Sequence, residues 1–220
     1  MLANLASLLT KSLIVLGALS FLVACPAFAD EVIFSNLGPG NSFSPVGWAV
    51  LGPTNSLTPN VEESIGMDFT PSANFNLSQV LLPLVFVSGT NGVDVSLVSD
   101  SGGLPGTTTL ESWTVTGIPN TSTLEDLAAS GVSLFGGTTY WIVAEAIASD
   151  TAAGWNMNNT GQNGFSVNQG KGWFAAPLAT SPALEVMGTA SVPEPSSLLL
   201  LGTGFIGLAG AARKRSASRA

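Results

Sequence analysis

Basic side chains are scarce in this sequence of 220 residues, and histidine is absent. Lys171 is the one basic residue between positions 30 and 192, where 13 acidic residues give a formal charge of −12. A segment with so little positive charge cannot neutralise a phosphate backbone, which argues against nucleic-acid binding. Without histidine, the chain also lacks the usual general base near neutral pH and the commonest metal ligand.

The N-terminal segment has the composition of an export signal. Lys11 precedes an uncharged apolar stretch over residues 12–23, and small residues at Ala27 and Ala29 end the segment. This order predicts a secretory signal peptide over residues 1–29, with a helical apolar part that is shorter than a membrane span requires. We expect export through the Sec machinery and cleavage by signal peptidase after Ala29.

The only cysteine supports an alternative interpretation of the same segment. Residues 22–25 resemble a bacterial lipobox, in which Cys25 would be lipidated and would anchor the protein to a membrane. Pro26 follows Cys25 directly, and the Ala-Phe-Ala cleavage site comes after it. Cleavage there leaves a mature chain without cysteine, so its fold must depend on burial rather than on disulfides.

The C-terminal segment carries three ordered features. They are Pro193-Glu194-Pro195, an uncharged apolar stretch over residues 198–212, and a basic end with Arg213, Lys214 and Arg215. A helix over residues 196–212 would be about 25 Å long, enough to cross a thin bilayer, with the basic residues as a cytoplasmic stop. An ordinary tail anchor behind a proline-rich linker is one interpretation.

The same three features resemble the PEP-CTERM sorting domain of Gram-negative, exopolysaccharide-producing bacteria. The resemblance covers residues 193–220. It implies that an exosortase recognises Pro193, Glu194 and Pro195, that residues 198–212 are a transient inner-membrane helix, and that residues 213–220 are a basic cytoplasmic tail. The protein would then reach the cell surface or the extracellular matrix.

Residues 30–192 are predicted to form one all-β domain, an antiparallel, jelly-roll-like β-sandwich. Short apolar or alternating runs are separated by glycine- and proline-rich turns, without alternating helices. The expected strands are residues 65–69, 80–87, 93–97, 109–116 and 138–147. Pro83 places the second of these near a sheet edge or at an irregularity.

Two local predictions complete this fold. Residues 124–129 are expected to form a short helix, with Ser122 as its cap and Glu125 completing a capping box. Asn91-Gly92 lies between apolar runs and predicts a tight β-hairpin.

Three segments of this block resemble the "choice-of-anchor" extracellular domains. They are residues 75–80, the run 93–106 with its Asp-Ser-Gly-Gly-Leu-Pro-Gly loop, and residues 134–143. The resemblance implies a surface-located sandwich and supplies no site.

Without histidine or, after cleavage, cysteine, the chain lacks the usual bases, nucleophiles and metal ligands of enzymes. Catalysis by a pair of carboxylates, as in glycoside hydrolysis, is the remaining possibility. The candidates are Glu62-Glu63, Glu125-Asp126, Asp94 with Asp100, and Glu145. We interpret them as solvated surface groups. Asp100 is also a weak candidate ligand for Ca²⁺, although an aspartate at this position commonly caps its own turn.

A cluster of aromatic and amide side chains suggests a sugar-binding surface. An aromatic ring can cover the apolar face of a sugar, while amides bind its hydroxyl groups. The candidate residues are Trp155, Asn156, Asn158, Asn159 and Trp173. Tryptophans of a sandwich also serve as core residues, a role that we assign to Trp48, Trp113 and Trp141.

These observations predict an exported, non-enzymatic surface or matrix protein that is sorted by exosortase, binds no cofactor and contacts exopolysaccharide. A carboxylate-dependent glycan-active enzyme and a calcium-stabilised adhesive module are the alternatives.

Overall fold

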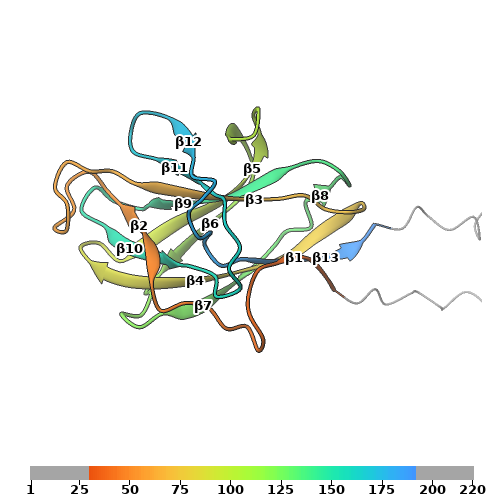
Figure 1. Ribbon diagram of the computed structural model, residues 1–220, viewed down its shortest axis with the longest axis horizontal. Helices are drawn as coiled ribbons and strands as arrows, with labels where there is room; N and C mark the ends of the chain where they lie inside the picture. The colour runs from red at the N-terminus through yellow and green to blue at the C-terminus, as the bar shows by residue number, and fades with distance from the viewer. Residues whose placement is uncertain (1–29, 192–220) are drawn as a thin grey trace, which may run out of the picture.

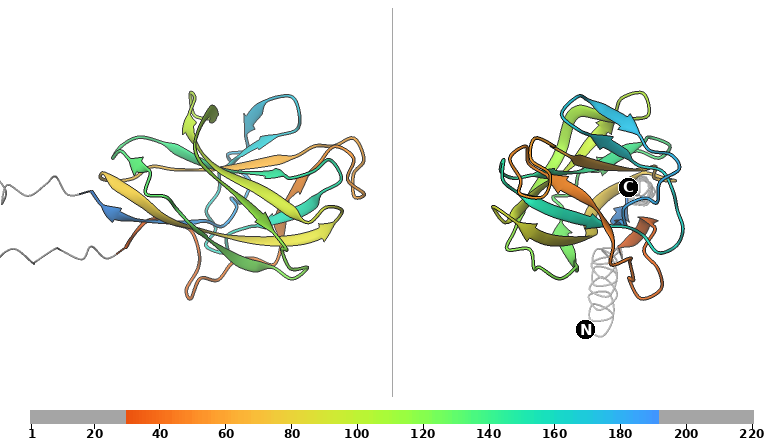
Figure 2. Two further views of the ribbon diagram at one scale, coloured as in Figure 1. Left: turned by 180° about the vertical axis from the view of Figure 1, so that it is seen from behind. Right: turned by 60° about the vertical axis from the view of Figure 1, so that its left-hand side comes forward.

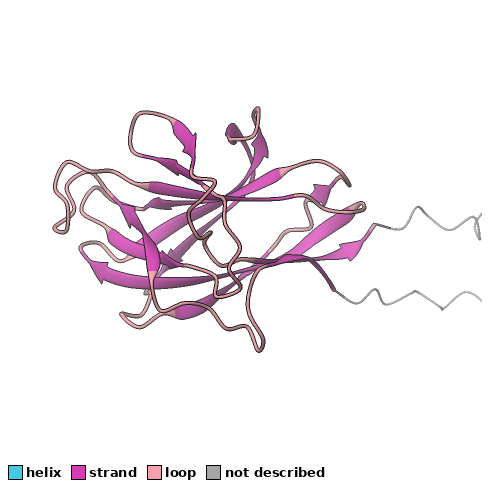
Figure 3. Ribbon diagram, in the orientation of Figure 1, coloured by secondary structure: helices cyan, strands magenta, loops and turns pink. Residues whose placement is uncertain are grey.

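The computed structural model describes residues 30–191, which consist of strands and loops (Figure 3). The predicted signal peptide, the sorting motif and the membrane helix lie outside these residues. The strands are β1 (Glu31–Ser35), β2 (Gly47–Leu51), β3 (Ser64–Phe69), β4 (Phe75–Ser88), β5 (Gly92–Asp100), β6 (Pro105–Thr116), β7 (Thr123–Ala128), β8 (Ser133–Leu134), β9 (Tyr140–Ala146), β10 (Ala152–Asn156), β11 (Ser166–Asn168), β12 (Trp173–Ala175) and β13 (Glu185–Ala190).

The strands form two antiparallel sheets that face each other (Figure 1). One sheet contains the order β2-β10-β4-β7, and the other contains β3-β9-β5-β6. The chain visits the two sheets in the sequence of an eight-stranded jelly roll, in which each sheet takes strands from both halves of the fold. Strands β1, β13 and β8 extend the first sheet, and β11 and β12 extend the second. The predicted all-β sandwich is confirmed.

The core lies between the sheets and is built from alternate residues of each strand. Strand β5 contributes Val93, Val95 and Leu97, and none of these side chains is exposed. Burial of each such side chain contributes roughly 1.5–3 kcal/mol, which is how the domain is stabilised without a disulfide. Because successive residues of a strand point to opposite faces, the residues between them lie on the outside of the sheet.

The helix predicted at residues 124–129 is wrong, because this segment is strand β7. It pairs with β4 from Gln79 to Leu84, and Leu127 is buried in the core. Six residues make too short a helix to be stable without tertiary support, whereas the open edge of β4 supplies a backbone partner for the whole segment. The side chain of Ser122 accepts a hydrogen bond from Asn156 Nδ2 at 3.0 Å.

The hairpin predicted at Asn91-Gly92 is also wrong, because β4 and β5 belong to different sheets. The Asn91 side chain accepts a hydrogen bond from Ile118 N at 2.8 Å and donates one to Ile118 O at 2.9 Å. Asn91 thus links the β4–β5 connection to the β6–β7 connection by hydrogen bonds. A hairpin with positive-φ glycines occurs instead between β5 and β6, at Gly102 and Gly103.

Pro83 lies in the interior of a sheet rather than at its edge. On one side of β4, the neighbour changes from β13, which pairs as far as Leu81, to β10, which pairs from Leu84 onwards. Proline cannot donate a backbone hydrogen bond, and it occupies the position where this ladder is already interrupted.

Two hairpins fold over the outer face of the β3-β9-β5-β6 sheet and meet above Gly66. Val98, Trp141 and Val143 form a small second core there, covered by Trp173. A Cβ atom on Gly66 would lie 2.9 Å from Pro105 Cγ and 3.3 Å from the Trp173 ring. Only glycine allows the tip of the β5–β6 hairpin and the β11–β12 hairpin to approach this closely.

Buried amides hold the loop that follows β10. Asn158 is 3% exposed, and its Nδ2 donates to the carbonyl oxygens of Gln162 and Ser181 at 2.8 and 2.7 Å. Its Oδ1 accepts from Thr160 N and Gln162 N. The side chain therefore replaces backbone pairing in this loop.

Replacement Asn158→Asp is expected to lower the free energy of unfolding by about 3 kcal/mol, because it turns a donor between two carbonyls into a buried charged acceptor. Thermal unfolding of the protein measures the change. The matched control is Asn159→Asp at the exposed neighbouring position, and an equal loss in both variants would contradict this assignment.

Candidate functional site

A row of polar side chains crosses the outer face of the sheet that contains β3, β5 and β9. The row, called the polar row below, consists of Thr114, Asp94, Glu145, Ser64, Asn168 and Trp173. Neighbouring strands lie about 4.8 Å apart, so six strands spread these groups over about 24 Å. The row forms because each of these residues except Trp173 alternates with a core residue on its own strand, whereas Phe174, the neighbour of Trp173, is exposed.

Hydrogen bonds and register fix the middle of the polar row. Asp94 lies directly opposite Glu145, and Thr114 Oγ1 donates to Asp94 Oδ1 at 2.7 Å. Ser64 donates a hydrogen bond to Glu145 from the other side, and Ser64 lies opposite Asn168. Two carboxylates facing each other across a strand pair are destabilising, so this arrangement costs the fold free energy.

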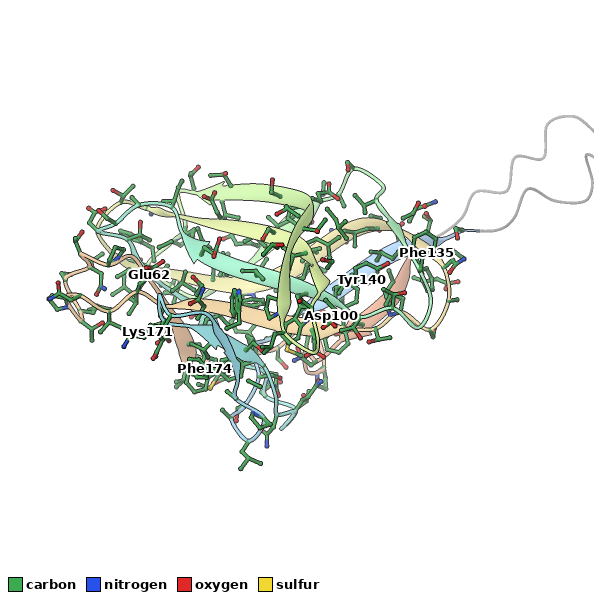
Figure 4. All side chains as sticks on the ribbon, turned by 90° about the horizontal axis from the view of Figure 1, so that it is seen from above. Glu62, Asp100, Phe135, Tyr140, Lys171 and Phe174 are labelled. Atoms are coloured by element: carbon green, nitrogen blue, oxygen red, sulfur yellow. The ribbon has the colours of Figure 1, made fainter. Side chains whose placement is uncertain are left out.

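The middle of the polar row, at Ser64 and Glu145, lines a pocket at the end of the sandwich remote from the chain termini (Figure 4). This distal pocket has a volume of about 310 Å³ and is lined by Glu62, Ser64, Glu145 and the loops around Gly52 and Ala148. Partial burial of the Glu145 carboxyl group raises its pKa, and the charge of Glu62 raises it further. Ser64 opposes this shift, and Asp94 adds a smaller increase.

A second pocket, called the hairpin pocket below, lies beneath the two hairpins and has a volume of about 300 Å³. Asp68, Asp100, Thr139 and Ser166 contribute its polar side chains. Asp100 Oδ1 accepts a hydrogen bond from Trp141 Nε1 at 2.9 Å, and its Oδ2 accepts from Gly103 N at 3.1 Å. Burial raises the pKa of Asp68, and the nearby charge of Asp100 raises it further.

The predicted sugar-binding cluster is not a surface. Trp155 is completely buried between the sheets, and its Nε1 donates to Ala183 O at 2.7 Å. Asn156 and Asn158 are also buried and are bonded to backbone groups. Asn159 is exposed near Ser42, and Trp173 alone of the cluster lies on the outer face with the polar row. Trp155, Asn156 and Asn158 therefore belong to the core, where their side chains donate hydrogen bonds to the backbone carbonyl groups of loops.

The acidic candidates combine differently from the predicted pairs. Asp94 faces Glu145 rather than Asp100, and Glu62 lies in a loop that brings it to Glu145. Glu125 and Asp126 lie on β7 in the other sheet. The prediction overlooked Asp68, although its alternation with the buried residues at 67 and 69 identifies it as a carboxylate on the outer face.

Of the tryptophans assigned to the core, Trp48 and Trp113 pack against the main core, as predicted. Trp141 is also buried, but it belongs to the second core on the outer face. Among residues 30–191, no group of three or more His, Cys, Asp or Glu side chains is arranged to hold a metal ion.

Residues 191–215 match the PEP-CTERM protein-sorting motif. This match supports an exported protein that is sorted by an exosortase. No curated protein is significantly similar to the chain. Between residues 30 and 191, no helix has the length and apolar character needed to cross a membrane.

The Glu145 carboxyl group gives the polar row a measurable pH dependence. A raised pKa in the folded state means that folding is favoured at low pH and that this contribution is lost as pH rises through the carboxyl range. Glu145→Gln is therefore expected to raise the melting temperature by about 1–2 °C at pH 7, equivalent to about 0.5 kcal/mol, and to have no effect near pH 3. Asp126→Asn on the other sheet is the control. A pH-independent gain would contradict the electrostatic explanation.

Proposed function

We propose that the protein is a non-enzymatic module of the cell surface or extracellular matrix, which uses the polar row to bind neutral exopolysaccharide. The sorting motif supports the location. The polar row carries the binding proposal, because it combines a partly exposed Trp173 ring with carboxylate, hydroxyl and amide groups. Such groups bind the ring faces and hydroxyl groups of sugars.

The chemistry of the polar row favours a neutral polymer over an acidic one. Asp94, Glu145 and nearby Glu62 accept hydrogen bonds from hydroxyl groups, but they repel uronates and sulfates. Lys171 is the one basic residue between positions 30 and 192, so the domain supplies little charge to attract an anionic chain.

The position of the chain ends supports surface display. Strands β1 and β13 pair with each other, so both ends of the described chain leave the sandwich on the same side (Figure 2). The distal pocket lies at the opposite end. A protein attached through its C-terminal segment would therefore hold this pocket away from the membrane.

Affinity electrophoresis of the exported protein, in gels that contain the neutral exopolysaccharide of the producing strain, tests the binding. Trp173→Ala and Asn168→Ala are expected to weaken retardation about tenfold, the equivalent of 1.4 kcal/mol. The matched control is Phe174→Ala, because Phe174 is 47% exposed on the other face of β12. Equal losses in all three variants would contradict the assignment.

The carboxylate-dependent enzyme remains a second candidate, favoured by the position of Glu62 opposite Glu145 and by the raised pKa of Glu145. Release of new reducing ends from the same polysaccharide, abolished by Glu145→Gln, would replace the binding proposal with glycoside hydrolysis.

The location is tested by the mass and termini of the extracellular form in the native host. We expect a chain that begins at Asp30 and ends near Pro193–Pro195. Replacement of all three motif residues by alanine is expected to leave the protein in the membrane fraction, whereas alanines at Ser196 and Ser197 should not. A full-length extracellular chain, or a lipidated Cys25, would contradict this route.

A further inference from the structure

The hairpin pocket contains an unexplained buried polar atom. Ser166 lines this pocket, its side chain is completely buried, and its Oγ has no hydrogen-bond partner. A buried hydroxyl group without a partner typically costs 1–3 kcal/mol, so a group that satisfies it is expected. Ser166 lies opposite Gly66 in the β11–β3 pairing, which places it on the outer face beneath the two hairpins.

The same pocket contains an uncompensated pair of carboxylates. Asp68 and Asp100 both line it, and their charges interact unfavourably. Lys171 does not serve this pair, because it lies on the β11–β12 turn, where the preceding Gly170 packs against Glu62 (Figure 4). Within residues 30–191, no basic side chain therefore compensates these two carboxylates.

The Asp100 carboxylate is already held in place for a ligand. Trp141 Nε1 donates a hydrogen bond to Oδ1, and Gly103 N donates to both oxygens, so Oδ2 keeps a free lone pair. Hydrogen bonds of this kind orient the carboxylates that bind metal ions. Asp100 can therefore cap its own turn and still bind a ligand.

We propose that the hairpin pocket binds a calcium-like divalent cation through the carboxylates of Asp68 and Asp100 and the hydroxyl group of Ser166. All three donors are hard oxygen ligands, which Ca²⁺ prefers. The two carboxylates and the hydroxyl supply at most five oxygens, so water completes the shell, and the dissociation constant falls in the range of about 10⁻⁴–10⁻³ M that is typical of extracellular modules.

A cation fits this pocket better than a sugar does. The aromatic rings that line it, Trp141 and Phe165, are 4% and 3% exposed, so they present no open face for stacking. The Ser166 hydroxyl group has no solvent contact, so a sugar ring cannot reach it. The cation would join β3, the β5–β6 hairpin and β11, and would hold both hairpins over the second core.

Thermal unfolding of the exported protein in 10 mM CaCl₂, against NaCl of equal ionic strength, tests the proposal. At the tenfold to hundredfold excess over the dissociation constant that 10 mM provides, Ca²⁺ is expected to raise the melting temperature by about 3–11 °C. Asp68→Asn should abolish this rise, while Asp126→Asn should retain it. Ser166→Ala should melt higher than the wild type without Ca²⁺, because it removes an unsatisfied hydroxyl group, and should gain less from Ca²⁺.

Three results would overturn the cation site. They are no rise in calcium, an equal reduction by Asp68→Asn and Asp126→Asn, and a rise that survives Asp68→Asn but is lost in Glu145→Gln, which would place the ion in the distal pocket. The inference rests on the proposed extracellular location but not on glycan binding. Glu145→Gln separates the two, because it changes the polar row and none of the three proposed ligands, and it should keep the calcium-dependent rise.

Discussion

The alternation of buried and outward-facing side chains along β3, β5 and β9 is the constraint on which the rest of the structure depends. With no cysteine in residues 30–191, the two sheets are held together by apolar burial, so every second residue of these strands must face the core. The residues between them are free of this requirement. Because the strands are in register, these outward-facing positions line up across the sheet as rows, of which one part packs under the hairpins and the other carries polar groups.

Those rows carry features that oppose stability. Asp94 and Glu145 face each other, Asp68 lies close to Asp100, and Ser166 buries a hydroxyl group without a partner. A sheet surface needs none of these arrangements, since serine, threonine or lysine would cover it at lower cost. Local features that reduce stability without a structural benefit are expected at functional sites. The two pockets of the outer face coincide with these positions, whereas the outer face of the other sheet shows Asp126 satisfied by Gln79 at 2.6 Å.

The sequence was sufficient for the parts of the fold that follow from period-two alternation. The strands around Ile65, Val93 and Trp113 are found where their patterns predicted them. The errors arose where tertiary contacts override local signals. Residues 123–128 have a helix-capping pattern but satisfy their backbone against β4, and Asn91 bonds to a loop that lies 27 residues away in sequence. Trp155 and Trp173 look alike in the sequence, because only the strand register shows that one faces the core and the other faces outward.

The arrangement of the chain ends connects the fold to the proposed surface location. The pairing of β1 with β13 closes the sandwich at one end, and the residues that match the sorting motif begin immediately after β13. Every loop that lines the distal pocket comes from the other end, where β2, β9 and β10 turn back (Figure 1). Attachment or release at the C-terminus therefore leaves the polar row and both pockets unobstructed. A ligand bound at the outer face contacts strands from the middle of the chain, so processing of either terminus has no effect on the residues that bind it.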